Sequence, residues 1–171
     1  MQAITHFLVG IILQILIFPY NPPLGIIFGI LTCFFSHFLV DSFAKVTYHP
    51  PDAKTNDKFW IIVHIIFYIG AGVVLIYYWI PYWIGMGFSV LIDIYDWGFI
   101  RGGRYIKKDP EWLEVYQIHP VIDKVRDRLF FWLPNWNVKR YGVVPEFVLI
   151  AIFLYFIECL SNYPPNQFGI I

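Results

Sequence analysis

Five long apolar runs take up most of this chain, and their length constrains its fold more than any other feature. They cover residues 3–18, 24–43, 59–80, 82–100 and 143–160. A helix needs about 20 apolar residues to cross a bilayer, so four runs are long enough and the first is short. None of them alternates polar and apolar residues as the strands of a barrel do. The sequence therefore predicts an all-α polytopic membrane bundle with about five transmembrane helices, the first being short, tilted or re-entrant.

The composition excludes several other classes of protein. Hydrophobic residues make up 58% of the chain and charged residues only 14%, which is too few to cover the surface of a soluble domain of this size. The twelve basic and twelve acidic residues cancel, whereas a nucleic-acid-binding protein usually carries a basic excess. Two cysteines are too few for a disulfide scaffold. We expect residues 1–171 to form a single integral membrane domain with no nucleic-acid partner and no cleaved signal peptide.

The basic residues predict the orientation of this domain. All twelve lie either between the second and third runs (45–58) or between the fourth and fifth (101–140). With five spans, both segments fall on the same side of the membrane, and the positive-inside rule makes that side cytoplasmic. We therefore expect an integral protein of the cytoplasmic membrane, with its N-terminus inside and its C-terminus outside.

The polar segment 101–142 contains one amphipathic pattern. Pro120 stands at a favourable first position for a helix, and Val121, Ile122, Val125 and Leu129 follow at helical spacing. This pattern predicts an interfacial helix over about 120–133, lying against the cytoplasmic leaflet. Packing of the same helix on the protein's own loops is the alternative.

Several ionisable side chains lie inside the predicted spans, where they are costly and usually functional. The predicted topology brings most of them to one level near the cytoplasmic face: His6, His37, Asp41, His64, Asp93 and Asp96. His37 and Asp41 are four residues apart, and Asp93 and Asp96 are three apart, so each pair lies on one helix face. His119 precedes Pro120 in a predicted loop, and no role is assigned to it.

Imidazole and carboxylate groups aimed into a helical bundle are typical metal ligands. We predict that His37, Asp41, His64, Asp93 and Asp96 hold one or two divalent ions, with zinc as the first candidate and manganese or iron as alternatives. His6 or a spare carboxylate is the candidate general base. Arg101 and Arg104 follow the fourth run directly and are candidates for binding a phosphate, although anchoring at the cytoplasmic face explains them equally well.

Two short motifs resemble the family of membrane-bound metal-dependent hydrolases. Thr5-His6-Phe-Leu-Val-Gly10 is similar to the opening Thr-His-x-x-x-Gly of that family, and Ser36-His37-Phe-Leu-Val-Asp41 to its Ser-His-x-x-x-Asp. In a related membrane family, His-x-x-x-Asp precedes a lysine and a His-x-x-x-Tyr, which Lys58 and His64-x-x-x-Tyr68 resemble here. The chain lacks the family's Pro-Asp-x-Asp, so Asp93 and Asp96 would take that role. The resemblance implies a metal site and adds Lys58 to the substrate-binding candidates.

Our leading hypothesis from the sequence is a metal-dependent hydrolase that acts at the cytoplasmic interface on an amphiphilic substrate, such as a phospholipid or polyprenyl phosphate. A site at the depth of the lipid headgroups, next to two arginines, favours a substrate of this kind. One alternative is a non-enzymatic membrane subunit, in a complex or a homo-oligomer, whose buried polar groups hold helices together. The other is a proton or metal carrier that uses the same carboxylates.

Overall fold

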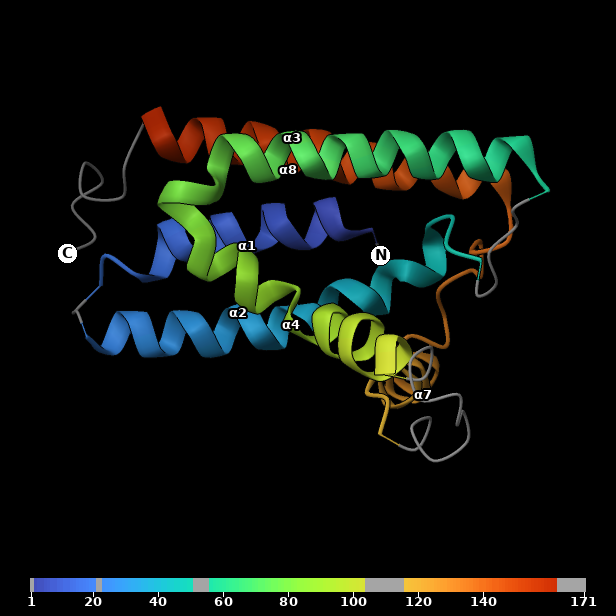
Figure 1. The fold of residues 1–171 in the computed structure, drawn as a ribbon, viewed down its shortest axis with the longest axis horizontal. Helices are drawn as coiled ribbons and strands as arrows, with labels where there is room; N and C mark the ends of the chain where they lie inside the picture. The colour runs from blue at the N-terminus through green and yellow to red at the C-terminus, as the bar shows by residue number, and fades with distance from the viewer. Residues whose placement is uncertain (1, 21–22, 51–55, 104–115, 163–171) are drawn as a thin grey trace.

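The computed structural model describes residues 2–20, 23–50, 56–103 and 116–162, and the elements in these ranges are all helical (Figure 1). The all-α fold class is therefore confirmed. In chain order the elements are α1 (Ala3–Ile17), α2 (Leu24–Ser42), η1 (Phe43–Val46), α3 (Lys58–Ser89), α4 (Leu91–Asp93), η2 (Ile94–Arg101), α7 (His119–Leu129), η3 (Arg140–Gly142) and α8 (Val143–Asn162).

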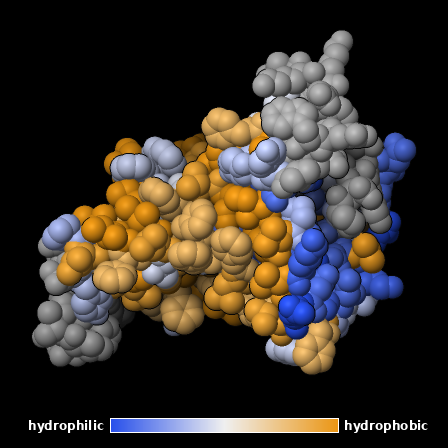
Figure 2. Space-filling model, turned by 90° about the horizontal axis from the view of Figure 1, so that it is seen from below, coloured by the Kyte–Doolittle hydropathy of each residue, from blue (hydrophilic) through white to orange (hydrophobic). Residues whose placement is uncertain are grey.

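Three helical segments are long and apolar enough to cross a membrane: Leu24–Val46, Lys58–Ser89 and Arg140–Asn162. Helix α1 is apolar as well but has only 15 residues. Figure 2 shows apolar side chains over most of the visible face, with hydrophilic ones gathered at the end where α7 lies. The structure thus supports a helical membrane protein whose polar groups are concentrated at one end.

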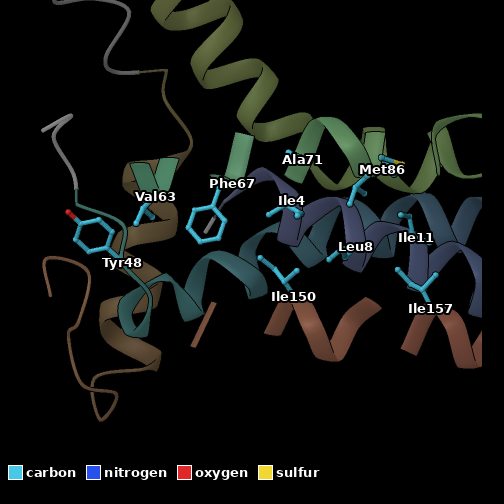
Figure 3. Packing of buried hydrophobic residues seen from close by; sticks show 11 residues of the cluster. Ile4, Leu8, Ile11, Tyr48, Val63, Phe67, Ala71, Met86, Ile150 and Ile157 are labelled. Atoms are coloured by element: carbon cyan, nitrogen blue, oxygen red, sulfur yellow. The ribbon is translucent and has the colours of Figure 1, made fainter. Parts of the chain in front are cut away.

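The short helix α1 lies at the centre of the bundle, where it contacts α2, α3 and α8. Its residues Leu8 and Ile11 are completely buried. They belong to one cluster of buried residues that also contains Phe67 and Met86 of α3 and Ile157 of α8 (Figure 3). Because α1 is surrounded by other helices, it does not need the full length of a transmembrane span to bury its apolar side chains.

The third and fourth apolar runs of the sequence meet at Pro81, and there α3 has a kink. Tyr82 leaves helical geometry, with φ −127° and ψ 19°. Proline has no N–H to continue the helix, so carbonyl and amide groups lose their usual partners at the kink. The side chain of Gln14 in α1 replaces those partners, since its Nε2 donates to the carbonyl of Pro81 (3.0 Å) and its Oε1 accepts from the N–H of Gly85 (2.7 Å).

After the kink, the chain runs back towards the end of the bundle where α1 begins (Figure 1). It passes through α4 into η2, which has the wider winding of a π-helix. Such π-helical turns are rare and often occur at functional sites. Here the turn contains Asp96, which lies just beyond Asp93 at the end of α4.

A helix is present where the sequence predicts one in segment 101–142, but α7 ends at Leu129 rather than near residue 133. The helix stops because Phe130 leaves helical geometry, and the carbonyl of Phe130 accepts from Lys45 Nζ (3.1 Å). Ile122 is buried, whereas Val121, Val125 and Leu129 are exposed.

Backbone hydrogen bonds join the residues after α2 to the segment that follows α7. The N–H of Trp136 donates to the carbonyl of Lys45 (2.7 Å), and the N–H of His49 donates to that of Asn137 (3.0 Å). These bonds fix α7 over the polar end of the bundle.

Candidate metal centre

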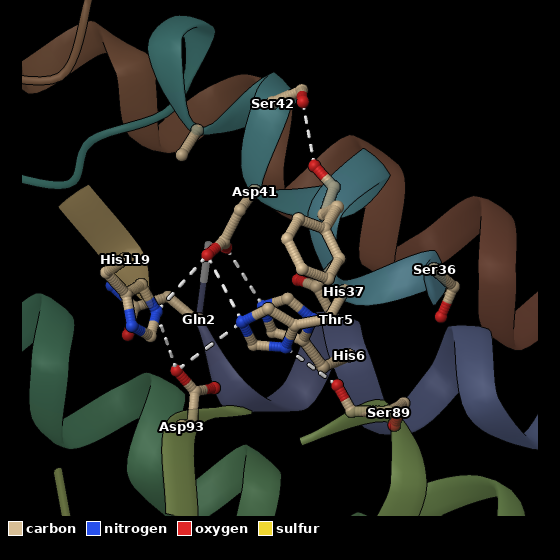
Figure 4. Close-up of polar contacts among 12 residues, drawn as sticks. Gln2, Thr5, His6, Ser36, His37, Asp41, Ser42, Ser89, Asp93 and His119 are labelled. Carbon is tan, nitrogen blue, oxygen red and sulfur yellow. Dashed lines mark hydrogen bonds and ion pairs between the residues drawn. The ribbon is translucent and has the colours of Figure 1, made fainter. Parts of the chain in front are cut away.

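Side chains from four separate elements meet at the polar end of the bundle (Figure 4). His6 comes from the first turns of α1, and His37 and Asp41 come from the last two turns of α2. Asp93 ends α4, and His119 begins α7. Asp41 is the common neighbour, because the nearest ring nitrogens of His6, His37 and His119 lie 3.1, 3.3 and 3.4 Å from its two oxygens.

His37, Asp41 and His119 form a set that we call the ligand triad. One ligand atom from each lies within 4.8 Å of the other two. Asp41 Oδ2 is 3.3 Å from His37 Nε2 and 3.4 Å from His119 Nε2. Ligand atoms about 2.1 Å from a tetrahedral ion lie about 3.4 Å apart. The triad therefore has the spacing of three metal ligands and leaves a fourth position for water or substrate.

The orientation of the His37 ring favours a cation at this position. Its Nδ1 lies 2.8 Å from the carbonyl oxygen of Ser89, which can only accept a hydrogen bond. The proton of the neutral ring is therefore on Nδ1, and Nε2 presents a lone pair. That lone pair faces carboxylate oxygens of Asp41 (3.3 Å) and Asp93 (3.8 Å), and it forms no hydrogen bond with any described residue. A cation between these atoms would satisfy all of them.

Asp96 holds the ring of His119 in place. Its carboxylate accepts backbone N–H groups from Ile118 (2.9 Å) and His119 (2.8 Å), and it also binds Nδ1 of His119 at 2.6 Å. Nε2 of His119 is then turned towards Asp41 and Asp93. A carboxylate behind a histidine is the usual way to fix the tautomer and direction of a metal ligand.

His119 is also the focus of the electrostatics. Burial alone would lower its pKa, but the neighbouring carboxylates of Asp41, Asp93 and Asp96 outweigh burial and raise the pKa to about 10. Three carboxylates around one imidazole thus attract positive charge strongly, whether it is carried by a proton or by a metal ion.

His6 stacks on His37 with ring centroids 4.1 Å apart. Its Nε2 lies 3.1 Å from Asp41 Oδ1, whereas the contacts within the triad are made by Oδ2. Its Nδ1 is buried without a hydrogen-bond partner among the described residues. His6, His37 and Asp93 form a second group of potential ligands that shares His37 with the triad.

The structure brings together four of the polar residues that the sequence selects, namely His6, His37, Asp41 and Asp93, and it places Asp96 directly behind them. It does not bring His64 to this cluster. The Nδ1 of His64 lies 2.8 Å from the carbonyl of Trp60 in the same helix, and its ring stacks on the indole of Trp60 at 4.0 Å. The sequence predicts a similar depth for His64, but its side chain is held along α3.

Of the substrate-binding candidates, Arg101 lies beside the cluster, in the lining of a polar cavity of about 200 Å³ that also includes Asp41 and His119. Its guanidinium stacks over Trp97 at 3.5 Å from the ring centroid. Lys58 is exposed at the start of α3. Arg104 lies outside the described residues.

His119 is the member of the site that sequence reasoning missed. It is 78 positions after Asp41 in the chain, in a segment with no apolar run, so neither depth nor helical spacing relates the two. The only available signal was a histidine directly before the proline that begins a helix. Comparisons with protein-family models, curated proteins and solved structures find no match to this chain. The geometry of the cluster is therefore the basis for assigning a function.

Proposed function

We propose that this protein is a membrane-embedded hydrolase that uses a divalent metal ion at the cytoplasmic face of the membrane. The observation that carries the proposal is the ligand triad, in which His37 Nε2 lies 3.3 Å from Asp41 Oδ2 without a hydrogen bond, while the carbonyl of Ser89 holds Nδ1 of the same ring. Two histidines and one carboxylate are the ligands of many catalytic zinc sites, and manganese or iron accept the same set.

Three protein ligands leave room for the chemistry of hydrolysis. A divalent ion bound here would lower the pKa of a water molecule towards neutrality. Asp93 is the spare carboxylate beside this position, with Oδ1 3.2 Å from His119 Nε2 and a side chain that is 25% exposed. It is therefore placed to accept a proton, alongside His6, the candidate base chosen from the sequence. His6 additionally holds the second oxygen of Asp41.

Two hollows next to the site support an amphiphilic substrate. The polar cavity of about 200 Å³ reaches the triad at Asp41 and His119, with Arg101 in its lining. An apolar groove of about 510 Å³ runs between α2 and α8 over α1, from Thr5 and Phe43 to Leu13 and Thr32. Ligand sites usually measure 300–1,000 Å³, so the groove can accept a hydrocarbon chain, while the cavity takes only a small polar group. A phospholipid or a polyprenyl phosphate has both parts.

The finer membrane arrangement is part of the same proposal. We infer five crossings. The helical segments of α3 before and after the kink count as separate crossings, and α1 counts as a short one. The basic residues of 45–58 and 101–140 would then face the cytoplasm. In this arrangement the exposed Val121, Val125 and Leu129 of α7 meet the cytoplasmic leaflet, which gives these apolar side chains a partner.

One observation favours the first alternative, a non-enzymatic subunit. Protonated His119 can pair with three carboxylates by itself, so the cluster is also able to hold α2, α4 and α7 together without a metal. The carrier alternative has less support. A carrier needs free polar groups in the outer half of the spans, and Gln14, which lies there, is already hydrogen-bonded at the kink of α3.

Metal analysis of the purified protein separates these functions. We expect about one equivalent of zinc, manganese or iron per chain after mild purification in detergent, and His37→Ala should lose it. His64→Ala is the matched control, since His64 is also a buried histidine of a span but lies outside the cluster. Asp96→Asn should weaken the metal affinity by about 10–100-fold, because the carboxylate no longer orients His119. Less than a tenth of an equivalent in the wild type would overturn the proposal.

Activity is tested on the metal-loaded protein by the release of inorganic phosphate from farnesyl phosphate and from dioctanoyl phosphatidic acid in micelles. We expect turnover that Asp41→Asn abolishes and His64→Ala leaves in place. A stoichiometric metal without turnover on phosphate esters would favour the non-enzymatic subunit.

A further inference from the structure

Helix α7 has an exposed face that the candidate metal centre does not use. Three apolar side chains lie one turn apart on the same side of the helix and are 43–61% exposed: Val121, Val125 and Leu129. Ile122, which follows Val121 in the chain, is buried instead, on the side from which α7 contacts α2. An apolar stripe left exposed beside a buried one is typical of a surface that binds a partner.

Basic side chains border this stripe. Lys124 and Arg128 are exposed, and no ion pair of the described residues involves either of them. In a helix of 3.6 residues per turn, the two lie about 20–60° from Val121. The acidic residues of α7 lie about 120–160° away from Val121, where both pair with Arg126 (2.7 and 3.1 Å): Asp123 and Asp127. The exposed stripe therefore carries positive charge at its edge and no negative charge.

We call this surface of α7 the docking face; it consists of Val121, Lys124, Val125, Arg128 and Leu129. A helix with an apolar face and a basic edge matches the surface of an anionic leaflet, which takes up the apolar side chains and attracts the cations. Such a surface is close by, because α7 lies at the polar end of the bundle, beside the end of α2 (Figure 1).

The aromatic residues after α7 fit the same partner. Phe131 and Trp132 follow the helix directly and are 75% and 65% exposed. Aromatic side chains, tryptophan above all, are enriched at the level of the lipid headgroups. The apolar surface of the docking face therefore continues beyond Leu129 with the residue types that anchor a helix at a membrane surface.

We propose that the docking face binds an anionic lipid leaflet and that this binding holds His119 in the metal centre. The inference deepens the proposed function, on which it rests for the metal ion and for the position of α7 at the membrane surface. His119 is the first residue of α7, and its Nε2 lies 3.2 Å from Asp93 and 3.4 Å from Asp41. A movement of α7 thus moves a ligand of the proposed ion.

The contacts within the protein hold α7 mainly at its two ends. Asp96 accepts the backbone N–H groups of Ile118 and His119, and Lys45 Nζ donates to the carbonyl of Phe130. A helix of 11 residues is marginally stable by itself, so its position depends on what it packs against. A leaflet that binds the docked helix stabilises the docked state by mass action. By linkage, it strengthens metal binding through His119.

Docking is tested by amide hydrogen exchange of α7 in the metal-free, full-length protein. The protein is placed in nanodiscs of phosphatidylcholine alone, or of phosphatidylcholine mixed equally with phosphatidylglycerol. We expect exchange of α7 to be slower by about 25-fold in the mixed discs, since each of two basic residues near an anionic surface contributes about fivefold. The amides of α8 should exchange equally in both discs and are the internal control.

Substitutions separate the docking face from general effects of the lipid. Lys124→Gln should reduce the difference between the discs about fivefold. Lys139→Gln is the matched control, since Lys139 is an exposed lysine outside α7, and its effect should stay below about twofold. Val125→Ser should speed exchange of α7 about fivefold in both discs, because an apolar side chain no longer enters the leaflet. Val138→Ser replaces an exposed valine outside α7 and should leave the exchange unchanged. Equal exchange of α7 in the two discs, or equal effects of Lys124→Gln and Lys139→Gln, would overturn the docking face.

The link to the metal centre is tested by the affinity for Zn²⁺ in the same discs. The wild type should bind zinc about tenfold more tightly in the mixed discs, and Lys124→Gln should weaken zinc binding there. Comparing the two proteins in one kind of disc removes the accumulation of cations at anionic lipids. The direction of the change is decisive, because the loss of a positive charge would by itself favour a cation. Unchanged or tighter zinc binding in Lys124→Gln would overturn the link. If the wild type binds no zinc in either disc, the proposed function fails, and hydrogen exchange still decides whether α7 binds the anionic leaflet.

Discussion

At the scale of single residues, the histidines of this protein differ in which residue binds the Nδ1 atom of the ring. Nδ1 of His37 is bound by the carbonyl of Ser89, and Nδ1 of His119 by the carboxylate of Asp96. Both partners come from other segments of the chain, so each ring is fixed with Nε2 towards Asp41. His64 is bound by Trp60 of its own helix and has no such constraint from a second element. The residues that orient the rings therefore decide which histidines form the site.

His49 gives a pH dependence that can be measured apart from the metal. Burial lowers its pKa to about 3, whereas an unfolded histidine has a pKa near 6.5. Above pH 6.5 the ring is neutral in both states. As the pH falls below 6.5, the unfolded chain binds a proton that the folded chain refuses, and the folded state loses up to about 1.4 kcal/mol per pH unit until the pH approaches 3.

This expectation is checked by unfolding the metal-free protein between pH 7 and pH 4.5 and comparing the wild type with His49→Gln. The variant should lose less stability on acidification, by about 1.4 kcal/mol for each pH unit below 6.5. The comparison subtracts the titration of the other groups, which both proteins share. Parallel curves for the two proteins would show that His49 is not kept neutral by the fold.

Part of the site could be predicted from the sequence at this scale. The four-residue spacing of His37 and Asp41 predicted that both lie on one helix face. The predicted topology placed the ionisable groups at one level near the cytoplasmic face, and this added His6 and Asp93 to the site. The level of a residue along a helix does not determine the direction in which its side chain points, and for that reason His64 was included. His119 could not be found, because its partner Asp96 lies 23 positions away and the contact depends on how α7 folds back.

At the scale of elements, the contact between α1 and the second half of α3 shapes the site. Gly10 and Gly85 face each other so closely that the backbones touch, and a methyl group on either would overlap the other's carbonyl. Gln14 lies one turn further along α1 and binds the carbonyl of Pro81 and the N–H of Gly85. Together these contacts set the angle at which α3 returns, and with it the position of Asp93.

We expect Gly10→Ala to destabilise the protein by about 2–3 kcal/mol, because its side chain has no space without moving the backbone of Gly85. Gly72→Ala is the control: it lies inside α3 with nothing within 4 Å of a new methyl group, so the higher helix propensity of alanine should leave stability unchanged or raise it by up to about 1 kcal/mol. Both effects are measured from unfolding in detergent. Equal stability of the two variants would contradict the close contact seen here.

The elements themselves were predictable to different degrees. Pro81 marked the change of direction, because proline removes a backbone donor whatever its surroundings. The contacts that complete the kink were not predictable, since Gln14 reaches across from another helix. The π-helical turn at Ile94–Arg101 likewise has no sequence signature, and it changes the relation between Asp93 and Asp96. Asp93 consequently faces the triad, while Asp96 lies behind His119.

At the scale of the whole molecule, the hydrophilic surface of the described residues gathers at one end of an apolar bundle, the end where α7 lies (Figure 2). The total charge of zero conceals this one-sided distribution, because every basic residue belongs to the segments 45–58 and 101–140. A membrane protein with this asymmetry has one preferred orientation. If the N-terminus lies in the cytoplasm and the chain crosses five times, the candidate metal centre is reached from the cytoplasm.

The orientation can be tested with reporter fusions at two points. A green fluorescent protein joined after Lys108 should fluoresce, and an alkaline phosphatase joined after Ile171 should be active, because the first position is expected inside and the second outside. The reciprocal pair, phosphatase after Lys108 and fluorescent protein after Ile171, should be silent and serves as the control. An active fluorescent protein at Ile171 would mean an even number of crossings, with either α1 or the return of α3 not crossing. The shared level of His6, His37, Asp41 and Asp93 would then follow from the contacts of the folded bundle and not from the depth of each residue in the membrane.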